Sequence, residues 1–331
     1  MSELDELKQL VDDIGRRSYD AQFGKRRLPE TFDAELWRNL DESGLTRLTT
    51  EQEAGPREAA IVLAGLARHG AAVPIAETDL LAGWLAGEAG LQIPTGPLTV
   101  AIGDAGVARD VPWPSDAAVV LAARAPDGLY VGLLTDPAVT IGHNLAGEPR
   151  GTLGYDSTGL TRLDPAVGDE LVRRGAWARC VQIIGAFDSA LELTVAHTGE
   201  RVQFGRTLSK FQAVQHSLAA MAGEIEQARA ATDLATAAVT DHGFAHARAD
   251  YAVTIAKVAV GRAVTPVTTI AHQLHGAIGV TIEHQLWSAT MRARSWADEF
   301  GSTASHAGRL GRLALEVADP WDVLITSPAP G

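Results

Sequence analysis

The chain has 331 residues, of which 41 are acidic and 28 basic, for a formal net charge of -13 at pH 7. An acidic chain without a Lys/Arg cluster is not expected to bind nucleic acid non-specifically. Its one cysteine, Cys180, excludes an intramolecular disulfide and is typical of a reducing compartment. The acidic N-terminus does not resemble a secretory signal, and the apolar runs are too short for a membrane span. We therefore expect a cytoplasmic globular protein of two or three domains.

Apolar residues at helical spacing predict an N-terminal helical domain over residues 1–92. Helices are expected at residues 3–20, 31–44, 55–70 and 74–90. Thr31 is the expected N-cap of the second of these helices, and Gly44 is its expected end.

The composition changes after Gln92 to short β-branched runs separated by Pro, Gly and Asp. These runs predict strands at residues 97–102, 117–124, 128–134 and 137–141. Pro126-Asp-Gly128 is a hairpin signal between two of them. The segment predicts a small antiparallel sheet, which forms a middle β-domain over residues 93–164.

The rest of the chain, residues 165–331, predicts a C-terminal helical domain. Long helices are expected at about 167–198, 211–241, 247–276, 282–296 and 302–317. Most are rich in alanine, which favours close approach of helices in a bundle. The predicted fold class is mostly α with a small β-domain.

A polar bend lies between the first two of these C-terminal helices, with Arg201, Gln203, Phe204 and Gly205 in sequence. Arg201 offers a fork of donors to a diphosphate, Phe204 offers a face to a planar ring, and Gly205 allows positive φ and close approach of a ligand. The alternative is an ordinary inter-helix turn whose arginine caps a helix C-terminus.

A second bend, Gln273-Leu-His-Gly-Ala-Ile-Gly279, ends a later helix. Exposed amides beside Gly276 and Gly279 can form an anion nest, and Gln273 adds a side-chain donor. The alternative is a helix C-cap followed by a tight turn. Thr281 is the expected cap of the next helix.

The sequence offers three other candidate sites. His272 and His275 are three residues apart, but no nearby Asp or Cys completes a ligand set, so no metal is expected. Cys180 lies on a helical stripe typical of a core, and no nucleophile elbow is present. Glu299, next to Asp298, is flanked by aromatic residues, which fits either a desolvated carboxylate or a solvated pair at a helix end.

Together, the phrases at residues 201–205, 211–216 and 273–279 resemble the C-terminal half of flavin-dependent acyl-CoA dehydrogenases. The resemblance implies an N-terminal helical domain, a middle β-domain and a C-terminal four-helix bundle that mediates oligomerisation. It also implies FAD at a subunit interface, held at its adenine and diphosphate end by Arg201, Gln203, Phe204, Gly205, Gln273, Gly276 and Gly279.

The chemistry implied by the resemblance is α,β-desaturation of an acyl-CoA thioester, in which a carboxylate removes the α proton and the flavin takes a hydride. The family's Tyr-Glu-Gly step is absent as such, and Glu299 aligns best with its catalytic base. Glu192 is a poor match to the base position that other members use. The electron acceptor implied is an electron-transfer flavoprotein.

Residues 101–108 depart from the Thr-Glu-Pro-x-x-Gly-Ser-Asp pattern that contacts the flavin ring and substrate in the family. This departure favours a shortened subunit, similar to the small subunits of actinobacterial α2β2 acyl-CoA dehydrogenases. Such a subunit would pair with a longer homologue and act on a steroid-derived or branched acyl-CoA. The alternatives are a self-sufficient homo-oligomer with Glu299 as base and a non-catalytic scaffold.

Overall fold

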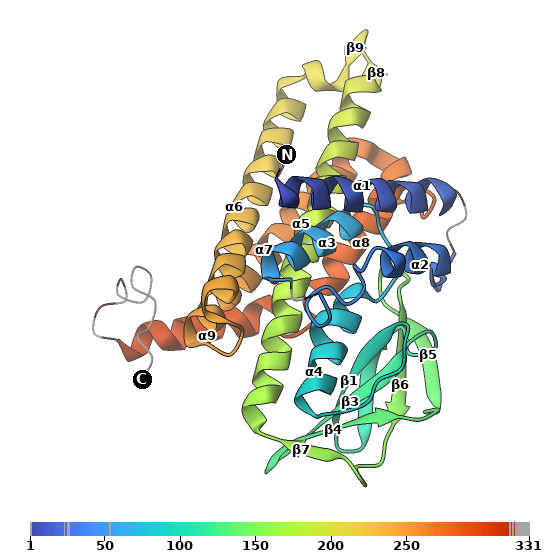
Figure 1. Ribbon diagram of the computed structural model, residues 1–331. Helices are drawn as coiled ribbons and strands as arrows, with labels where there is room; N and C mark the ends of the chain where they lie inside the picture. Colours follow the sequence, from blue (N-terminus) through green and yellow to red (C-terminus); the bar gives the residue numbers. More distant parts are fainter. Residues whose placement is uncertain are drawn as a thin grey trace. The chain divides into compact units, whose positions relative to one another are not determined.

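The structure is a computed structural model that describes residues 2–22, 24, 27–52, 54–317, 319 and 321 (Figure 1). The chain divides into two compact units. The first unit comprises the chain up to Leu63 together with Ala71–Ala178, and the second comprises Ala64–Gly70 and the chain from Arg179 onward. The boundaries of the three expected domains, after residues 92 and 164, stay a prediction.

The first unit begins with helices where the sequence predicts them. They are α1 (Glu3–Gln22), α2 (Ala34–Glu42), the first part of α3 (Pro56–Arg68), a π-helical segment η1 (Glu77–Gly83) and α4 (Trp84–Glu88). The N-cap of α2 is Asp33 rather than Thr31, because the Asp33 carboxylate accepts the Leu36 amide at 2.9 Å. Gly44, with φ 70°, follows the end of this helix as expected.

The π-helical segment η1 is buried at every residue and is bonded to the sheet. The Thr78 hydroxyl accepts the Leu98 amide at 3.0 Å and donates to the Leu98 carbonyl at 3.1 Å. Asp79 accepts the backbone amides of Thr49 and Thr50 at 3.0–3.1 Å. These bonds fix the wide helical turn between a loop and the first strand.

The sheet of the first unit has seven strands in the order β5-β6-β2-β1-β3-β4-β7. Its strands are β1 (Leu98–Asp104), β2 (Val107–Pro112), β3 (Ala118–Ala125), β4 (Gly128–Leu134), β5 (Val139–His143), β6 (Pro149–Gly154) and β7 (Thr161–Leu163). The expectation of a purely antiparallel sheet is wrong for one pair, since β1 and β3 are parallel. β2 turns back along one edge of β1, so the chain reverses a second time before β3 reaches the other edge.

One face of this sheet forms a hydrophobic core with small and branched side chains. Its buried members are Ala101, Ala108, Val111, Val119, Leu121, Ala123 and Leu153. Tyr130, Leu134, Tyr155 and Leu160 pack against them. Val119, Leu121 and Ala123 alternate along β3, as residues on one face of a strand do.

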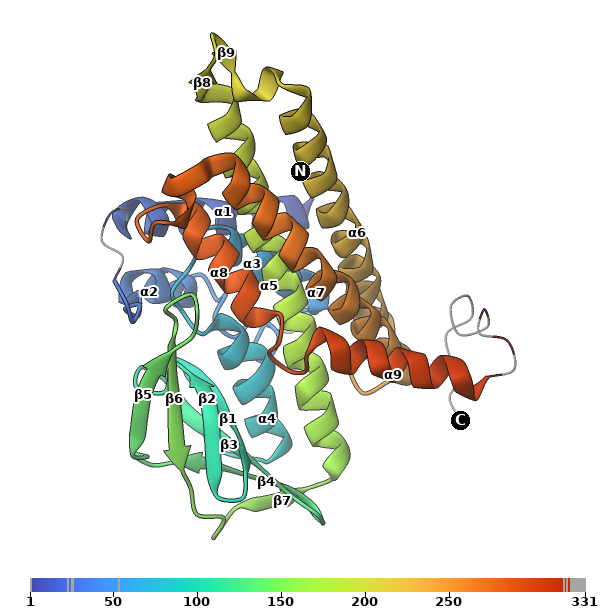
Figure 2. The same cartoon turned by 180° about the vertical axis from the view of Figure 1, so that it is seen from behind.

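The second unit is built from long helices. It contains α5 (Pro165–Glu200) from Arg179, β8 (Val202–Gln203), β9 (Arg206–Thr207), η2 (Leu208–Lys210), α6 (Gln212–His242), α7 (Ala247–His275), η3 (Gly276–Val280), α8 (Gln285–Trp296) and α9 (Thr303–Glu316). α6 and α7 lie side by side, as both views show (Figures 1 and 2). Thr303 of α9 approaches Gly261 of α7 so closely that a methyl group there would clash with it.

The segment Ala247–Val280 is long and apolar enough to cross a membrane, by length and composition alone. The sequence predicted no such segment. Half of its most apolar window is buried within the protein, and Lys257 on it is 2% exposed. The same length and composition are found in core helices of soluble bundles, so this helix is weak evidence for a membrane.

Candidate functional site

The expected bend after α5 is a two-residue β-hairpin, in which Gln203 pairs with Arg206. Phe204 and Gly205 have φ values of 52° and 79°. Positive φ at both central residues defines a type I′ turn, where Asn-Gly and Gly-Gly are the usual choices. Phe204 is therefore an uncommon residue in an unfavourable backbone conformation, and its side chain is 93% exposed.

Arg201 closes the base of this hairpin through its backbone. Its amide donates to the His197 carbonyl, and its carbonyl accepts the Leu208 amide, both at 2.9 Å. Its exposed side chain bonds no helix carbonyl and no carboxylate within the described part of the chain. The capping interpretation is therefore unsupported, and Arg201 presents an available cation close in sequence to the exposed Phe204 ring.

The rest of the hairpin supports this arrangement. The Arg206 guanidinium lies over the Phe211 ring at 4.1 Å from its centroid, and Phe211 meets Phe204 edge to face at 6.3 Å. The Gln203 side chain is exposed, and a methyl group added at Gly205 would meet no atom within 4 Å. The hairpin thus offers a cation, an aromatic face and an open backbone, which suit a phosphate joined to a planar ring.

The second bend joins α7 to η3, and its two glycines differ. Gly276 has φ 67°, its amide donates to the His272 carbonyl as a C-cap, and a methyl group there would lie in open space. Gly279 is buried, and a methyl group there would lie 2.7 Å from Cβ of His275. Gly276, with the exposed Gln273, is therefore open to a ligand, whereas Gly279 serves close packing.

The expected cap of α8 at Thr281 is wrong. His284 occupies the N-cap, where its Nδ1 accepts the Leu286 amide at 3.1 Å. The Thr281 hydroxyl instead donates to the Ile278 carbonyl at 2.9 Å, within the bend. Histidine is not among the preferred N-cap residues, so no local signal pointed to His284.

The two bends begin from neighbouring helix ends. The imidazoles of His197 and His275 stack with their centroids 4.5 Å apart and 22° between their planes. His197 lies in the last turn of α5 and His275 is the last residue of α7, and both views show these helix ends together (Figures 1 and 2). His197 was not among the residues predicted from the sequence, although it lies one helical turn before Arg201.

Glu299, the expected base, accepts a hydrogen bond at 2.6 Å from Nε of Arg179, whose side chain is 3% exposed. Lys257 Nζ donates to the carbonyls of Ala297 and Glu299, both at 2.7 Å. A carboxylate paired with a buried guanidinium is stabilised in its charged form, which opposes proton abstraction. The role of Glu299 as base stays a prediction.

Residues 101–108, where the family pattern is missing, form a plain β-hairpin. Ala105 and Gly106 have positive φ at the turn between β1 and β2. The Tyr155 ring covers Gly103 so closely that any side chain there would clash with it. Asp104 is the one carboxylate of these eight residues, and none of them carries a hydroxyl.

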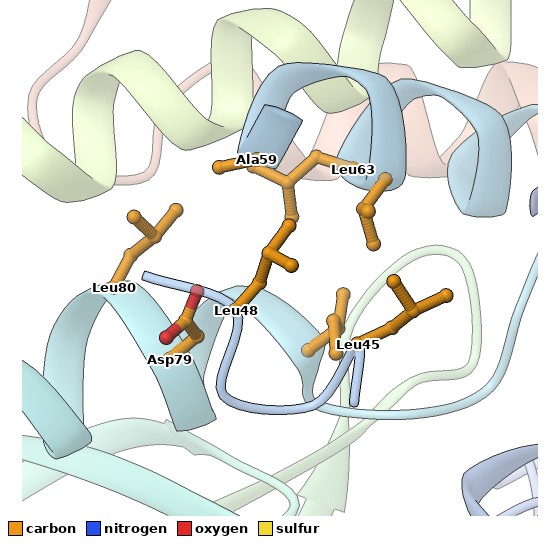
Figure 3. A pocket seen from close by; sticks show the side chains of 8 residues that line it. Leu45, Leu48, Ala59, Leu63, Asp79 and Leu80 are labelled. Atoms are coloured by element: carbon orange, nitrogen blue, oxygen red, sulfur yellow. The ribbon is translucent and has the colours of Figure 1, made fainter. Parts of the chain in front are cut away.

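The first unit contains a small cavity, of about 10 Å³, lined by Leu45, Leu48, Ala59, Val62, Leu63, Ile75, Asp79 and Leu80 (Figure 3). This space holds about one water molecule and no acyl chain. Burial raises the pKa of Asp79, against the effect of the amides that it accepts. Among the described residues, no group of three His, Cys, Asp or Glu side chains is placed to hold a metal ion.

The C-terminal half of the chain is similar to proteins of known family. The family model described as "Acyl-CoA dehydrogenase, C-terminal domain" matches residues 169–314. Acyl-CoA dehydrogenase IpdE2 of Mycolicibacterium smegmatis is 32% identical over 155 residues, which cover 46% of this chain and 45% of that protein. The matched region thus spans less than half the length of such curated relatives.

Solved structures match nearly the whole chain. The ChsE4-ChsE5 complex of Mycobacterium tuberculosis matches with a TM-score of 0.81 at 23% identity, over 96% of this chain and 98% of that one. The Tcur3481-Tcur3483 steroid ACAD variant matches with a TM-score of 0.79 at 25% identity, over 95% and 98%. The expected family and fold class are therefore confirmed: residues 169–314 form an acyl-CoA dehydrogenase C-terminal domain, in a chain with the acyl-CoA dehydrogenase fold.

Proposed function

We propose that this chain is a subunit of an FAD-dependent acyl-CoA dehydrogenase and that its second unit holds the adenine and diphosphate end of the flavin. The observation that carries the proposal is the pair of open bends at adjacent helix ends, joined by the His197–His275 stack. One bend presents Arg201 and Phe204, and the other presents Gln273 beside the open Gly276.

The residues present fit such a cofactor. Arg201 has no carboxylate partner in the described chain and is free to donate to a diphosphate. Phe204 supplies an exposed ring for the adenine, and Gln273 supplies a side-chain amide. Gly276 leaves room for phosphate oxygens next to the backbone. When bound, FAD supplies the hydride acceptor of the desaturation, while these residues only bind and orient it.

We further propose that the chain acts with a longer homologous partner. The plain hairpin at residues 101–108 and the ion pair of Glu299 both favour chemistry on another subunit. The solved relatives named above are a ChsE4-ChsE5 complex and a Tcur3481-Tcur3483 steroid ACAD, which supports a paired arrangement and a steroid-derived acyl-CoA substrate. A branched acyl-CoA is the other expected substrate, and an electron-transfer flavoprotein is the expected acceptor.

Co-purification with the product of a neighbouring longer homologue tests the proposal. The pair should carry FAD, seen by its absorbance, and oxidise acyl-CoA, whereas the chain alone should do neither. Stoichiometric FAD and turnover by the lone chain would instead support a self-sufficient homo-oligomer.

A variant pair identifies the role of the hairpin. Arg201→Ala should weaken cofactor binding by about 2–4 kcal/mol and empty the flavin site. Arg262→Ala, which removes an exposed arginine on α7, is the matched control and should keep its flavin. Unchanged flavin content in Arg201→Ala would support a non-catalytic scaffold.

A further inference from the structure

One imidazole, that of His275, contacts three segments of the second unit. Its ring stacks on His197 at 4.5 Å and meets the ring of His284 at 5.1 Å, with 69° between the planes. Its Cβ is the atom against which Gly279 packs. The end of α5, the bend of η3 and the start of α8 therefore meet at this side chain.

The surroundings of the His275 ring favour its neutral form. Nδ1 lies 2.9 Å from the Ala271 carbonyl, so Nδ1 carries the proton and donates it. Nε2 is buried and has no hydrogen-bond partner, and the residue is 6% exposed. A second proton would have to reside on Nε2, where the described chain provides no acceptor for it.

The titratable groups that act on His275 within the described chain are bases. They are His197 from α5, His272 from α7 and His284 at the cap of α8, with Arg294 of α8 acting on His272. Glu200 and Glu283 are neighbours in sequence of this group, but both are exposed. Burial is the main cause that lowers the pKa of His275, to about 4. The neighbouring imidazoles lower the pKa further, whereas the hydrogen bond to the Ala271 carbonyl opposes the shift.

The three neighbouring imidazoles of His197, His275 and His284 are not arranged to bind a metal ion. His284 uses Nδ1 to accept the Leu286 amide, so its Nε2 carries the proton. His275 uses Nδ1 as a donor. Two of the three rings thus have one nitrogen committed to the backbone, and their arrangement is that of packing.

We propose that His275 is a positioning residue that couples the two ligand-binding bends while its ring is neutral, so that mild acid loosens both bends together. That the bends hold a dinucleotide rests on the proposed function. The coupling between the bends does not depend on it. Since the ring stacks on His197 in the last turn of α5 and Cβ of His275 packs beside Gly279 of η3, displacement of this side chain frees the root of each bend.

The size of the effect follows from proton linkage. An opened imidazole titrates near its ordinary pKa of 6.5 and the closed one at about 4. Protonation therefore favours the opened state as the pH falls below about 6.5, and the junction keeps its full stability above that value. Between pH 7.5 and pH 5.0 the equilibrium constant for opening should rise about thirtyfold.

Amide hydrogen exchange of the full chain tests this without any cofactor. Protection factors, corrected for intrinsic exchange, are compared at pH 7.5 and pH 5.0 for the segments 198–204 and 276–284. Both segments should lose protection together, by about thirtyfold. A loss in only one segment, or no loss in either, would overturn the coupling.

Two variants separate charge from packing. His275→Phe keeps an uncharged ring for stacking, and His275→Asn keeps a donor for the Ala271 carbonyl; both should lose most of the acid-induced change. His242→Phe is the matched control, because His242 also stacks on a histidine, His246, at 4.8 Å but is exposed. An acid response that persists in both His275 variants contradicts the proposal.

The flavin complex gives the second readout. If the proposed function holds, the wild-type pair should release FAD more readily at pH 5.0 than at pH 7.5, and the His275→Phe pair should retain it. A chain that shows the coupled exchange change but never binds FAD would refute the proposed function and leave the junction standing.

Discussion

Arg179 of α5 donates through Nε to the carboxylate of Glu299 at 2.6 Å, and this pair fastens the turn between α8 and α9 to the middle of α5. The Arg179 guanidinium also bonds Gln182 at 2.6 Å and faces the rings of Trp296 and Phe300. Lys257 holds the same turn by its carbonyls. The turn is therefore built around buried cations, with Glu299 as a counter-charge.

Glu299→Gln should consequently change stability more than catalysis. The amide keeps an acceptor for Arg179 but removes the charge that balances it, and we expect a loss of about 1–3 kcal/mol in the free energy of unfolding. Turnover of the pair should change little. Urea unfolding and steady-state kinetics check the two effects. A collapse of turnover at unchanged stability would make Glu299 the catalytic base.

The single thiol should be inert in the folded protein. Cys180 is fully buried, and burial raises the pKa of its thiol to about 12 despite the nearby charge of Lys257. At pH 8 the thiolate fraction should be about a thousandfold below that of an ordinary cysteine. A coloured disulfide reagent should therefore react only after urea unfolds the chain, with one equivalent. Fast reaction of the native protein would contradict the packing of α5.

Alanine at two glycines of the second unit should have opposite effects. Gly279→Ala places a methyl group 2.7 Å from Cβ of His275 and 3.0 Å from Cδ2 of Leu286, and should cost about 1–3 kcal/mol. Gly223 lies within α6, and a methyl group added there would meet no atom within 4 Å. Gly223→Ala should therefore stabilise the folded chain by about 0.5–1 kcal/mol. Thermal unfolding compares them. Equal effects would mean that η3 shifts freely away from His275.

Phe204→Asn should stabilise the free chain while weakening flavin binding. Asparagine tolerates the φ of 52° found there and restores the Asn-Gly pair typical of a type I′ turn, for a gain of about 1 kcal/mol. The same change removes the exposed ring proposed for the adenine. Urea unfolding of the chain and flavin content of the pair are the measurements. Full flavin content in the pair that carries Phe204→Asn would exclude the ring from cofactor binding.

The helices followed from sequence because their signals are local. The 3.6-residue apolar pattern predicted α1, α5, α6 and α7 to within a few residues at each end. Three strands of the seven-stranded sheet were not predicted, since β2 and β6 contain Pro, Gly or charged residues and β7 has three residues. The parallel pairing of β1 with β3 depends on where β2 settles, which no local pattern encodes.

In the candidate site, too, local motifs could be predicted from the sequence, whereas contacts between distant residues could not. The motif residues at 201–205 and 273–279 could be named from sequence because their order and spacing resemble a known family. The relation of Arg179 to Glu299 joins positions 120 apart, and the stack of His197 on His275 joins two helix ends, so neither is visible in a single sequence. The type I′ turn was also missed, because phenylalanine is a poor signal for positive φ.

The strained hairpin tip gives related chains a simple diagnostic. A large ring held at positive φ and left in solvent is unfavourable for folding, so only a benefit elsewhere keeps it there. Lineages whose subunits have given up the dinucleotide should drift at this position toward asparagine or glycine, while lineages that still hold it should retain an aromatic residue. One column of an alignment would then distinguish working subunits from those that serve only as structural partners.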